Sequence, residues 1–204
     1  MTAPDVTVNR RDTAFGFELL GALRASRNLG AISGRLPYIQ DRAIGTLRRR
    51  LPVIARRDIQ QEYSIKAARV RQDLSARDIA GGIRLTGHWR GIGLSQFGAR
   101  QTRKGVTAAA LRGKRTLRAH AFLATLLGGG RHAVHREGPK RPMTKGRYIG
   151  KRRQPLVVEY GPTLSQMLRK GRRPERLVEA ARGVLAAEMQ RLTESELRRY
   201  GVTS

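Results

Sequence analysis

Hydrophobic residues three and four positions apart predict a long helical segment within residues 36–75. On an α-helix this spacing places side chains on one stripe, which can pack against a core. The residues of this stripe are Ile44, Leu47, Leu51 and Ile54. Pro52 interrupts the pattern, so the sequence predicts either a kinked helix or a second helix that begins there and runs towards Tyr63.

Two shorter segments flank this helical stretch. Residues 1–35 are predicted to be an N-terminal extension, in which the apolar residues from Phe15 to Leu23 form one short helix and Gly30–Gly34 a linker. On the other side, Ser64 can cap a short helix. The apolar residues of that short helix are Ile65, Val70 and Leu74.

The pattern changes to alternation after Asp78, and residues 79–160 are predicted to be rich in strands. Ile83, Leu85 and Gly87 alternate with polar residues towards Trp89, as in a half-buried strand. Three further segments read as strands, namely Val106–Leu111, Arg131–Arg136 and Leu156–Tyr160.

Two other parts of this region are less regular. The segment Leu117–Leu127 is apolar without a clear period, and Phe122 and Leu123 are expected in the core. The glycines Gly128–Gly130 predict a turn. The segment Pro139–Gln154 is rich in glycine, proline and lysine and is predicted to be an exposed loop or arm.

Residues 162–200 are predicted to form two helices. Thr163 and Gln166 form a capping box, and Gly171 ends the first helix. Pro174 and Glu175 suit the first turn of the second helix. Its apolar stripe consists of Val178, Ala181, Leu185, Met189 and Leu192, and Gly201 ends it. The expected fold is therefore α+β, one domain over residues 36–204 with a mainly antiparallel central sheet and basic hairpin loops between helical ends.

Positive charge is concentrated in the strand-rich region. The chain has a formal net charge of +27, and eighteen of its Lys and Arg residues lie between Asp78 and Glu159 with one acid, Glu137. Such a density of like charge favours a polyanion or an acidic partner over a bare solvated surface. The predicted contact residues are Arg100, Arg103, Lys104, Arg112, Lys114, Arg115, Arg118, Lys140, Arg141, Lys145, Arg147, Lys151, Arg152 and Arg153.

These basic clusters favour contact with a phosphate backbone over base reading. Base reading requires a recognition helix or stacking aromatics, and Tyr148 is the one aromatic residue within the clusters. Composition does not separate DNA phosphates from an acidic protein surface as the partner. A cellular nucleic-acid-binding protein without sequence preference is therefore one interpretation of the chain.

No pattern of catalytic, metal-binding or cofactor-binding residues stands out. Cysteine is absent, and acidic residues are scattered, so a paired-carboxylate site would need distant contributions. His132 and His135 lie three apart, which in a strand directs them to opposite faces and away from a shared metal ion. The sequence predicts no enzyme, no cofactor, no metal and, with no apolar run of about 20 residues, no membrane span.

The order of several short motifs resembles the minor tail protein Z family of long-tailed bacteriophages, also called tail completion proteins. The motifs span roughly residues 40–195 and keep the family's order. They are Ile54–Arg57, Glu62–Lys66 with Val70–Arg71, Gly98–Val106, His120–Leu123, Arg131–Arg136 and Val158–Thr163. His120 departs from a glycine that is usual in the family's corresponding "Gly-Ala-Phe-Ile" strand.

This resemblance implies a structural virion protein at the head-proximal end of the tail, assembled in the host cytoplasm. It would act in tail completion and head–tail joining as a ring around the DNA channel, commonly hexameric. Its expected partners are further copies of itself, the tail terminator, tail tube or head-closure proteins, and genome-end DNA.

Overall fold

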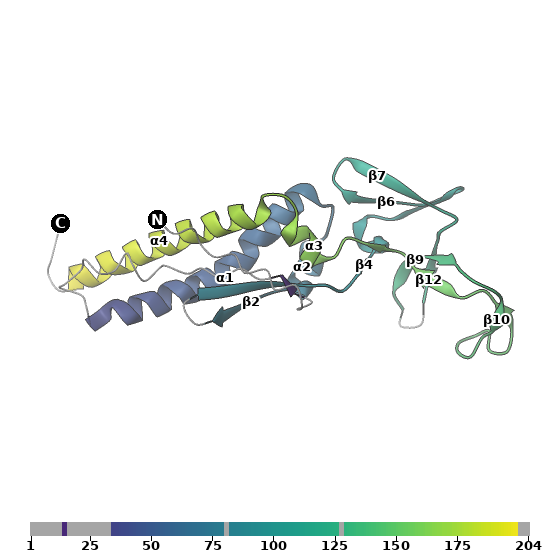
Figure 1. Cartoon of the computed structure of the whole chain (residues 1–204), viewed down its shortest axis with the longest axis horizontal. Helices are drawn as coiled ribbons and strands as arrows, with labels where there is room; N and C mark the ends of the chain where they lie inside the picture. The colour runs from purple at the N-terminus through teal and green to yellow at the C-terminus, as the bar shows by residue number, and fades with distance from the viewer. Residues whose placement is uncertain (1–13, 16–33, 80–81, 127–128, 200–204) are drawn as a thin grey trace. The chain divides into compact units, whose positions relative to one another are not determined.

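The computed structural model describes residues 14–15, 34–79, 82–126 and 129–199 and confirms the α+β class. The chain divides into two compact units (Figure 1). The first is formed by the described residues up to Ile59, by Arg71–Trp89 and by those from Leu164 onwards. The second is formed by Gln60–Val70 and Arg90–Thr163.

Two long helices, α1 (Leu36–Glu62) and α4 (Arg173–Arg199), lie side by side in the first unit (Figure 1). Polar contacts tie them together along their length. These join Arg35 to Glu196 (3.4 Å), Thr46 to Glu188 (3.3 Å) and Arg176 to Asp58 (2.8 Å). Residue numbers rise along α1 as they fall along α4, so the two helices are antiparallel.

The buried side of α1 differs from the predicted stripe. Its buried residues are Ile39, Ala43, Leu47, Leu51, Ala55 and Ile59. Leu47 and Leu51 are therefore confirmed as core, whereas Ile44 and Ile54 are only half-buried. Positions four apart drift by about 40° per step around a helix, so this buried line winds around α1. The two alanines in it were missed because small side chains carry little weight in an apolar pattern.

Pro52 lies within α1, which continues through it to Glu62. The predicted alternative of a separate second helix is therefore wrong. The short helix α2 (Ala67–Asp73) was expected, but it ends before Leu74, which begins strand β2 (Leu74–Ile79).

The first unit also contains a small antiparallel sheet. Strand β3 (Gly82–His88) confirms the predicted alternation and pairs with β2 on one side and with β1 (Ala14–Phe15) on the other. Phe15 is thus in a strand rather than in the expected helix, and the rest of that helix lies outside the described residues. Helix α3 (Leu164–Arg169) packs on β3, where a Cβ at Gly87 would lie 2.7 Å from Cδ1 of Leu168.

The C-terminal stripe is largely confirmed. Val178, Ala181, Leu185 and Leu192 are buried in α4, and Met189 is half-buried. The predicted stop at Gly201 lies outside the described residues.

The second unit consists of short antiparallel strands. Two sheets have three strands each, β5–β6–β7 (Arg100–Thr102, Gly105–Leu111, Lys114–Ala119) and β12–β9–β8 (Leu156–Val158, Arg131–Arg136, Phe122–Thr125). Two strand pairs complete it, β4–β13 (Ile92–Gly93, Tyr160–Gly161) and β10–β11 (Arg141–Pro142, Arg152–Arg153). The buried hydrophobic residues of the unit are Ile92, Leu94, Phe97, Val106, Ala108, Ala121, Ala133 and Val134, with Tyr63, Ile65 and Val70 from residues 60–70.

The ambiguous segment Leu117–Leu127 contains the end of β7, a turn and the whole of β8. Ala121 is buried, but Phe122 and Leu123 are only half-buried, so their expected place in the core is wrong. The Phe122 ring instead packs under the guanidinium of Arg136, 5.4 Å from the ring centroid. An aromatic ring that lies outside the core can pack favourably against a cation at the surface.

Gly105 is required where β6 begins, and we expect Gly105→Ala to disrupt the β5–β6–β7 sheet. Its φ is +147°, and an added Cβ would lie 2.1 Å from the carbonyl oxygen of Arg118 on the neighbouring strand. We expect a loss of about 2–3 kcal/mol in the free energy of unfolding, measured by chemical denaturation.

Gly113→Ala is the matched control for this change. Gly113 also has a positive φ, +74°, but nothing lies within 4 Å of an added Cβ. It should therefore lose only the part of the free energy that comes from backbone strain. Equal losses in the free energy of unfolding for the two variants would show that the contact with the Arg118 carbonyl does not itself destabilise the sheet.

Candidate nucleic-acid interface

The β5–β6–β7 sheet has a core-facing side and an outer side. Val106 and Ala108 are fully buried, which defines the core-facing side. Arg100, Thr107 and Leu117 are paired in register across the three strands and alternate with those residues, so they share the outer side. Leu117 is exposed there among basic and hydroxyl side chains.

Strand β7 is unusual because all six of its residues are exposed. It lies at the edge of its sheet, so its outward backbone groups have no neighbouring strand in that sheet. Hairpin turns place further basic residues at both ends of the sheet. Arg103 and Lys104 form the turn between β5 and β6, and Arg112 lies in the turn between β6 and β7. The second turn is held by a hydrogen bond from the Arg112 backbone N–H to the Glu62 carbonyl (2.8 Å).

The predicted contact residues Arg112, Lys114, Arg115 and Arg118 divide into two kinds. The Arg115 guanidinium donates to the carbonyl oxygens of Gly98 (2.9 Å) and Thr107 (3.2 Å), so it braces the sheet. Arg118 lies 3.7 Å from the Glu159 carboxylate. Arg112 and Lys114 are exposed and form no ion pair within the described ranges, so their charges face solvent. The sequence pattern did not separate these roles.

The predicted contact residues from Lys140 to Arg153 lie on a hairpin arm, Gly138–Gln154. It contains β10 and β11, so of the two predicted alternatives, an exposed loop or an arm, the structure shows a two-stranded arm. Lys140, Arg141, Lys145, Arg147, Lys151 and Arg152 are exposed, and Arg153 is half-buried. The Arg153 guanidinium lies 3.6 Å from the centroid of the Tyr148 ring, and the Lys151 ammonium 5.9 Å from it. Tyr148 is therefore engaged by cations of its own arm.

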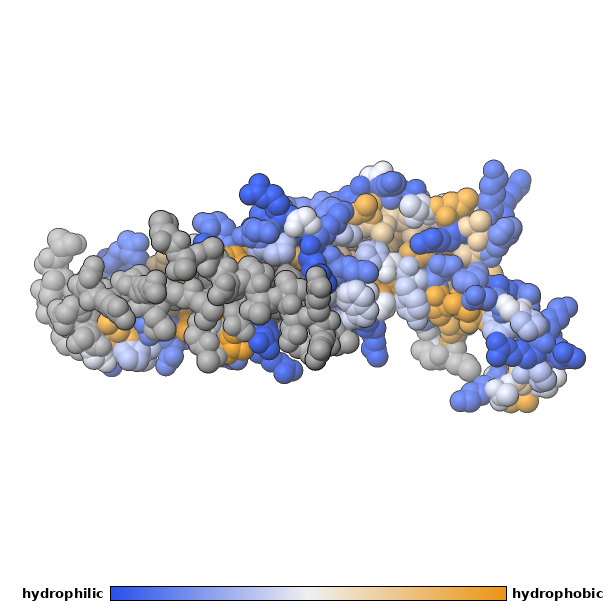
Figure 2. Space-filling view, viewed as in Figure 1, coloured by the Kyte–Doolittle hydropathy of each residue, from blue (hydrophilic) through white to orange (hydrophobic). Residues whose placement is uncertain are grey.

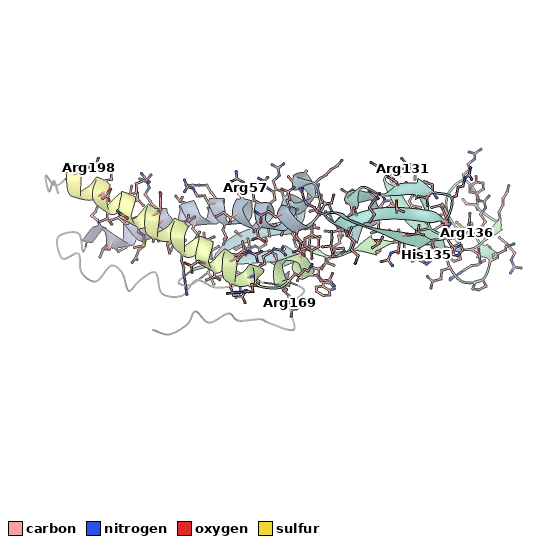
Figure 3. All side chains as sticks on the ribbon, turned by 90° about the horizontal axis from the view of Figure 1, so that it is seen from above. Arg57, Arg131, His135, Arg136, Arg169 and Arg198 are labelled. Carbon is pink, nitrogen blue, oxygen red and sulfur yellow. The ribbon has the colours of Figure 1, made fainter. Side chains whose placement is uncertain are left out.

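All fourteen predicted contact residues lie in the second unit, and thirteen of them are exposed. Basic side chains project from its strands, among them Arg131 and Arg136 of β9 (Figure 3). On the face shown in Figure 2, hydrophilic residues surround a few small hydrophobic areas in this unit. The predicted contact residues therefore all lie in one compact unit, but they do not converge on a single site.

One acid–base cluster escaped the sequence analysis. Nδ1 of His135 lies 2.8 Å from Oε1 of Glu159, although not in hydrogen-bond geometry, and Nε2 lies 3.5 Å from Glu137. Glu159 also pairs with Arg118, so it is a local counter-ion for the basic strands. No set of three metal-ligating side chains occurs within the described ranges.

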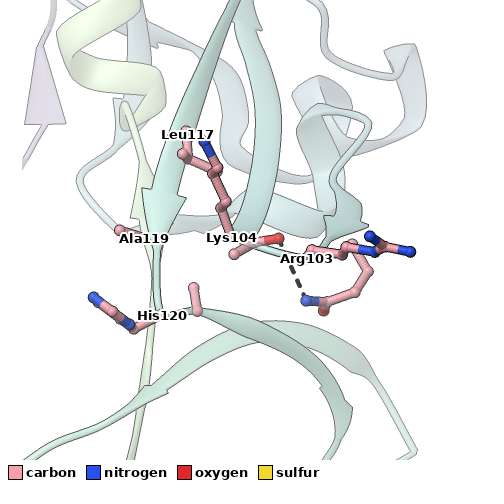
Figure 4. A pocket seen from close by; sticks show the side chains of 8 residues that line it. Arg103, Lys104, Leu117, Ala119 and His120 are labelled. Atoms are coloured by element: carbon pink, nitrogen blue, oxygen red, sulfur yellow. Dashed lines mark hydrogen bonds between the residues drawn. The ribbon is translucent and has the colours of Figure 1, made fainter.

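A shallow hollow of about 470 Å³ lies beside the first hairpin turn (Figure 4). Arg103, Lys104, Leu117 and His120 are among its lining residues. Figure 4 shows the side chains of Arg103 and His120 pointing to opposite sides, so these two side chains do not converge on one ligand. His120 has a φ of +61°, a left-handed conformation that glycine adopts without strain.

No family model matches this chain, and no curated protein or solved structure was found to be significantly similar to it. Among the helices described, none is long and apolar enough to span a membrane.

Proposed function

We propose that this chain is a structural, non-enzymatic virion protein of a long-tailed phage, of the tail-completion type represented by minor tail protein Z. It would act at the head-proximal end of the tail in head–tail joining, as a ring, commonly of six copies, around the DNA channel. The motif order over residues 40–195 supports the family, and the α+β fold with helical ends is compatible with it.

The observation that carries the proposal is the exposed positive charge of the second unit. Thirteen of the fourteen predicted contact residues are exposed there, and the region between Asp78 and Glu159 contributes a single acid, Glu137. Like charges gathered on one small unit repel one another unless an anion neutralises them. Genome-end DNA in the channel would supply that anion, and the tail terminator, tail tube or head-closure proteins would contact other surfaces.

A cellular nucleic-acid-binding protein could use the same basic surface, and assembly distinguishes the two functions. We expect the purified protein to sediment as a discrete ring, and to restore head joining when added to tails that lack it. A monomer that binds RNA tightly and does not associate with tails would support the cellular alternative and overturn this proposal.

Replacing three solvent-facing cations of the sheet should weaken DNA binding without regard to sequence. In the variant with Lys104, Arg112 and Lys114 changed to Gln, the log–log dependence of affinity on salt should become shallower by about 0.9 for each phosphate that the variant no longer neutralises. The measurement is a binding titration with unrelated duplexes at several salt concentrations. Arg115 is left in place because it braces the sheet.

The matched control variant removes the same number of positive charges, three, from the first unit instead. Arg57, Arg71 and Arg198 are exposed, and their change to Gln should leave the salt dependence nearly as it was. If both triple variants reduce the salt dependence of DNA binding equally, binding depends on the net charge of the protein and not on the cations of this sheet. If neither does while tail joining fails, the sheet binds an acidic protein.

A further inference from the structure

The arm Gly138–Gln154 is a two-stranded ribbon held by hydrogen bonds within the arm. Below its tip, the backbone N–H of Met143 donates to the carbonyl of Lys151 (3.1 Å), and that of Gly150 donates to the carbonyl of Met143 (2.9 Å). At its base, the Gln154 side-chain amide donates to the carbonyl of Gly138 (3.2 Å). The arm therefore holds its shape through its own hydrogen bonds.

A hydrophobic residue stands at the tip of this ribbon. Gly146 and Gly150 have φ values of +86° and +80° and bracket a tight turn, closed by a hydrogen bond from the Ile149 N–H to the Gly146 carbonyl (3.3 Å). Ile149 is 67% exposed, the highest fraction among the large hydrophobic residues described. Turn tips normally carry polar residues, so this isoleucine is not explained by the fold of the arm.

The positive charges of the arm are not balanced by any acidic residue of the arm itself. Residues 139–154 include seven Lys and Arg residues and no acid. Arg141 stands directly opposite Arg153 in the ladder, and like charges in that position are destabilising. Stacking on Tyr148 occupies Arg153 but does not neutralise it. The arm thus presents cations on both strands with one apolar side chain between them at the tip.

We propose that this arm binds duplex DNA in a groove and inserts Ile149 between adjacent base pairs, bending the duplex. A two-stranded ribbon fits a DNA groove, its cations can reach the phosphates on either side, and apolar wedges unstack base steps in this manner. The inference rests on the DNA contact in the proposed function and identifies the side chains that make it. Duplex DNA accounts for both features, since its phosphates meet the cations and its base stack receives the isoleucine.

The test compares Ile149→Ala with the wild-type chain on a short duplex that carries a fluorophore at each end. Wild-type protein should bring the ends closer, and the variant should lose most of that change and bind about tenfold more weakly. The salt dependence of binding should stay the same, because no cation is removed. The double variant Lys145→Gln, Arg147→Gln should show the opposite pattern. Its salt dependence of binding should be shallower, and the DNA in its complex should still be bent.

Val53→Ala is the matched control, because Val53 is an exposed hydrophobic residue of α1 outside the arm, and it should change neither bend nor affinity. An Ile149→Ala variant that bends DNA like the wild type would overturn the wedge while leaving the DNA contact standing. Wild-type protein that does not bind DNA would overturn both. Capture of the arm by anionic phospholipid vesicles, abolished in Ile149→Ala without any change in DNA bending, would assign the tip to a lipid surface instead.

Discussion

Asp58→Ala is expected to destabilise the first unit by about 3–5 kcal/mol, because it removes the carboxylate that accepts a hydrogen bond from a buried guanidinium. Arg173 is 1% exposed, and its Nε donates to the Asp58 carboxylate. A second hydrogen bond, from Nη1 to the Met167 carbonyl, holds the same side chain. Arg176 shares Asp58 through contacts of 2.8 and 2.9 Å, so one carboxylate links the start of α4 to α1.

The same ion pair predicts how stability depends on pH. Burial alone would raise the pKa of Asp58, but hydrogen bonds from Arg176 and Arg173 and their positive charges outweigh it, so its pKa lies below the ordinary 3.8. Because the pKa of Asp58 is lower in the folded state, this residue contributes its full stabilisation at pH values above its pKa in the unfolded chain. That contribution is lost as the pH falls below about 4 and through the folded pKa.

Urea denaturation at neutral and acidic pH measures both effects. The wild-type chain should lose stability below about pH 4, and Asp58→Ala should lack that part of the pH dependence. Asp78→Ala is the matched control, since Asp78 is about half exposed in its pair with Arg48 (2.7 Å) and should cost less than about 1 kcal/mol. Equal losses in the two variants would contradict a special role for the buried guanidinium.

Regular hydrophobic periods made most elements predictable. The α1 and α4 helices and strand β3 each bury one side, so their apolar residues recur at the period of the element. The strand predicted at Arg131–Arg136 coincides with β9. Glycine and proline positions likewise indicated where the arm lies, although not that it is paired.

The missed features depend on partners that are distant in sequence. Strand β7 has no buried side and therefore no period to detect. Arg173 looked like one more surface arginine, because nothing local indicates that Asp58, 115 positions away, accepts its hydrogen bond. A long side chain with a paired charge can be buried, whereas residue type alone predicts exposure.

The candidate interface was predictable in composition but not in detail. Runs of Lys and Arg located the exposed clusters, since flexible cations need no particular period to be solvent-facing. Assigning Arg115 to the sheet backbone and Arg118 to Glu159 required their three-dimensional neighbours. The isoleucine at the tip of the arm carried no signal in sequence, because only the pairing of the arm shows that Ile149 lies at an exposed turn.

Leu185→Asp is expected to yield insoluble or unassembled protein, with a loss of about 3–5 kcal/mol in the free energy of unfolding. Leu185 is 7% exposed on the buried side of α4, between the buried Ala181 and Leu192. The variant removes the packing of a leucine and buries a carboxylate at an apolar position of the helix. Ala186→Asp is the matched control, because Ala186 is exposed on the same helix and its carboxylate would remain in water. Soluble yield and thermal unfolding compare the two, and equal behaviour would show that this side of α4 is open to solvent.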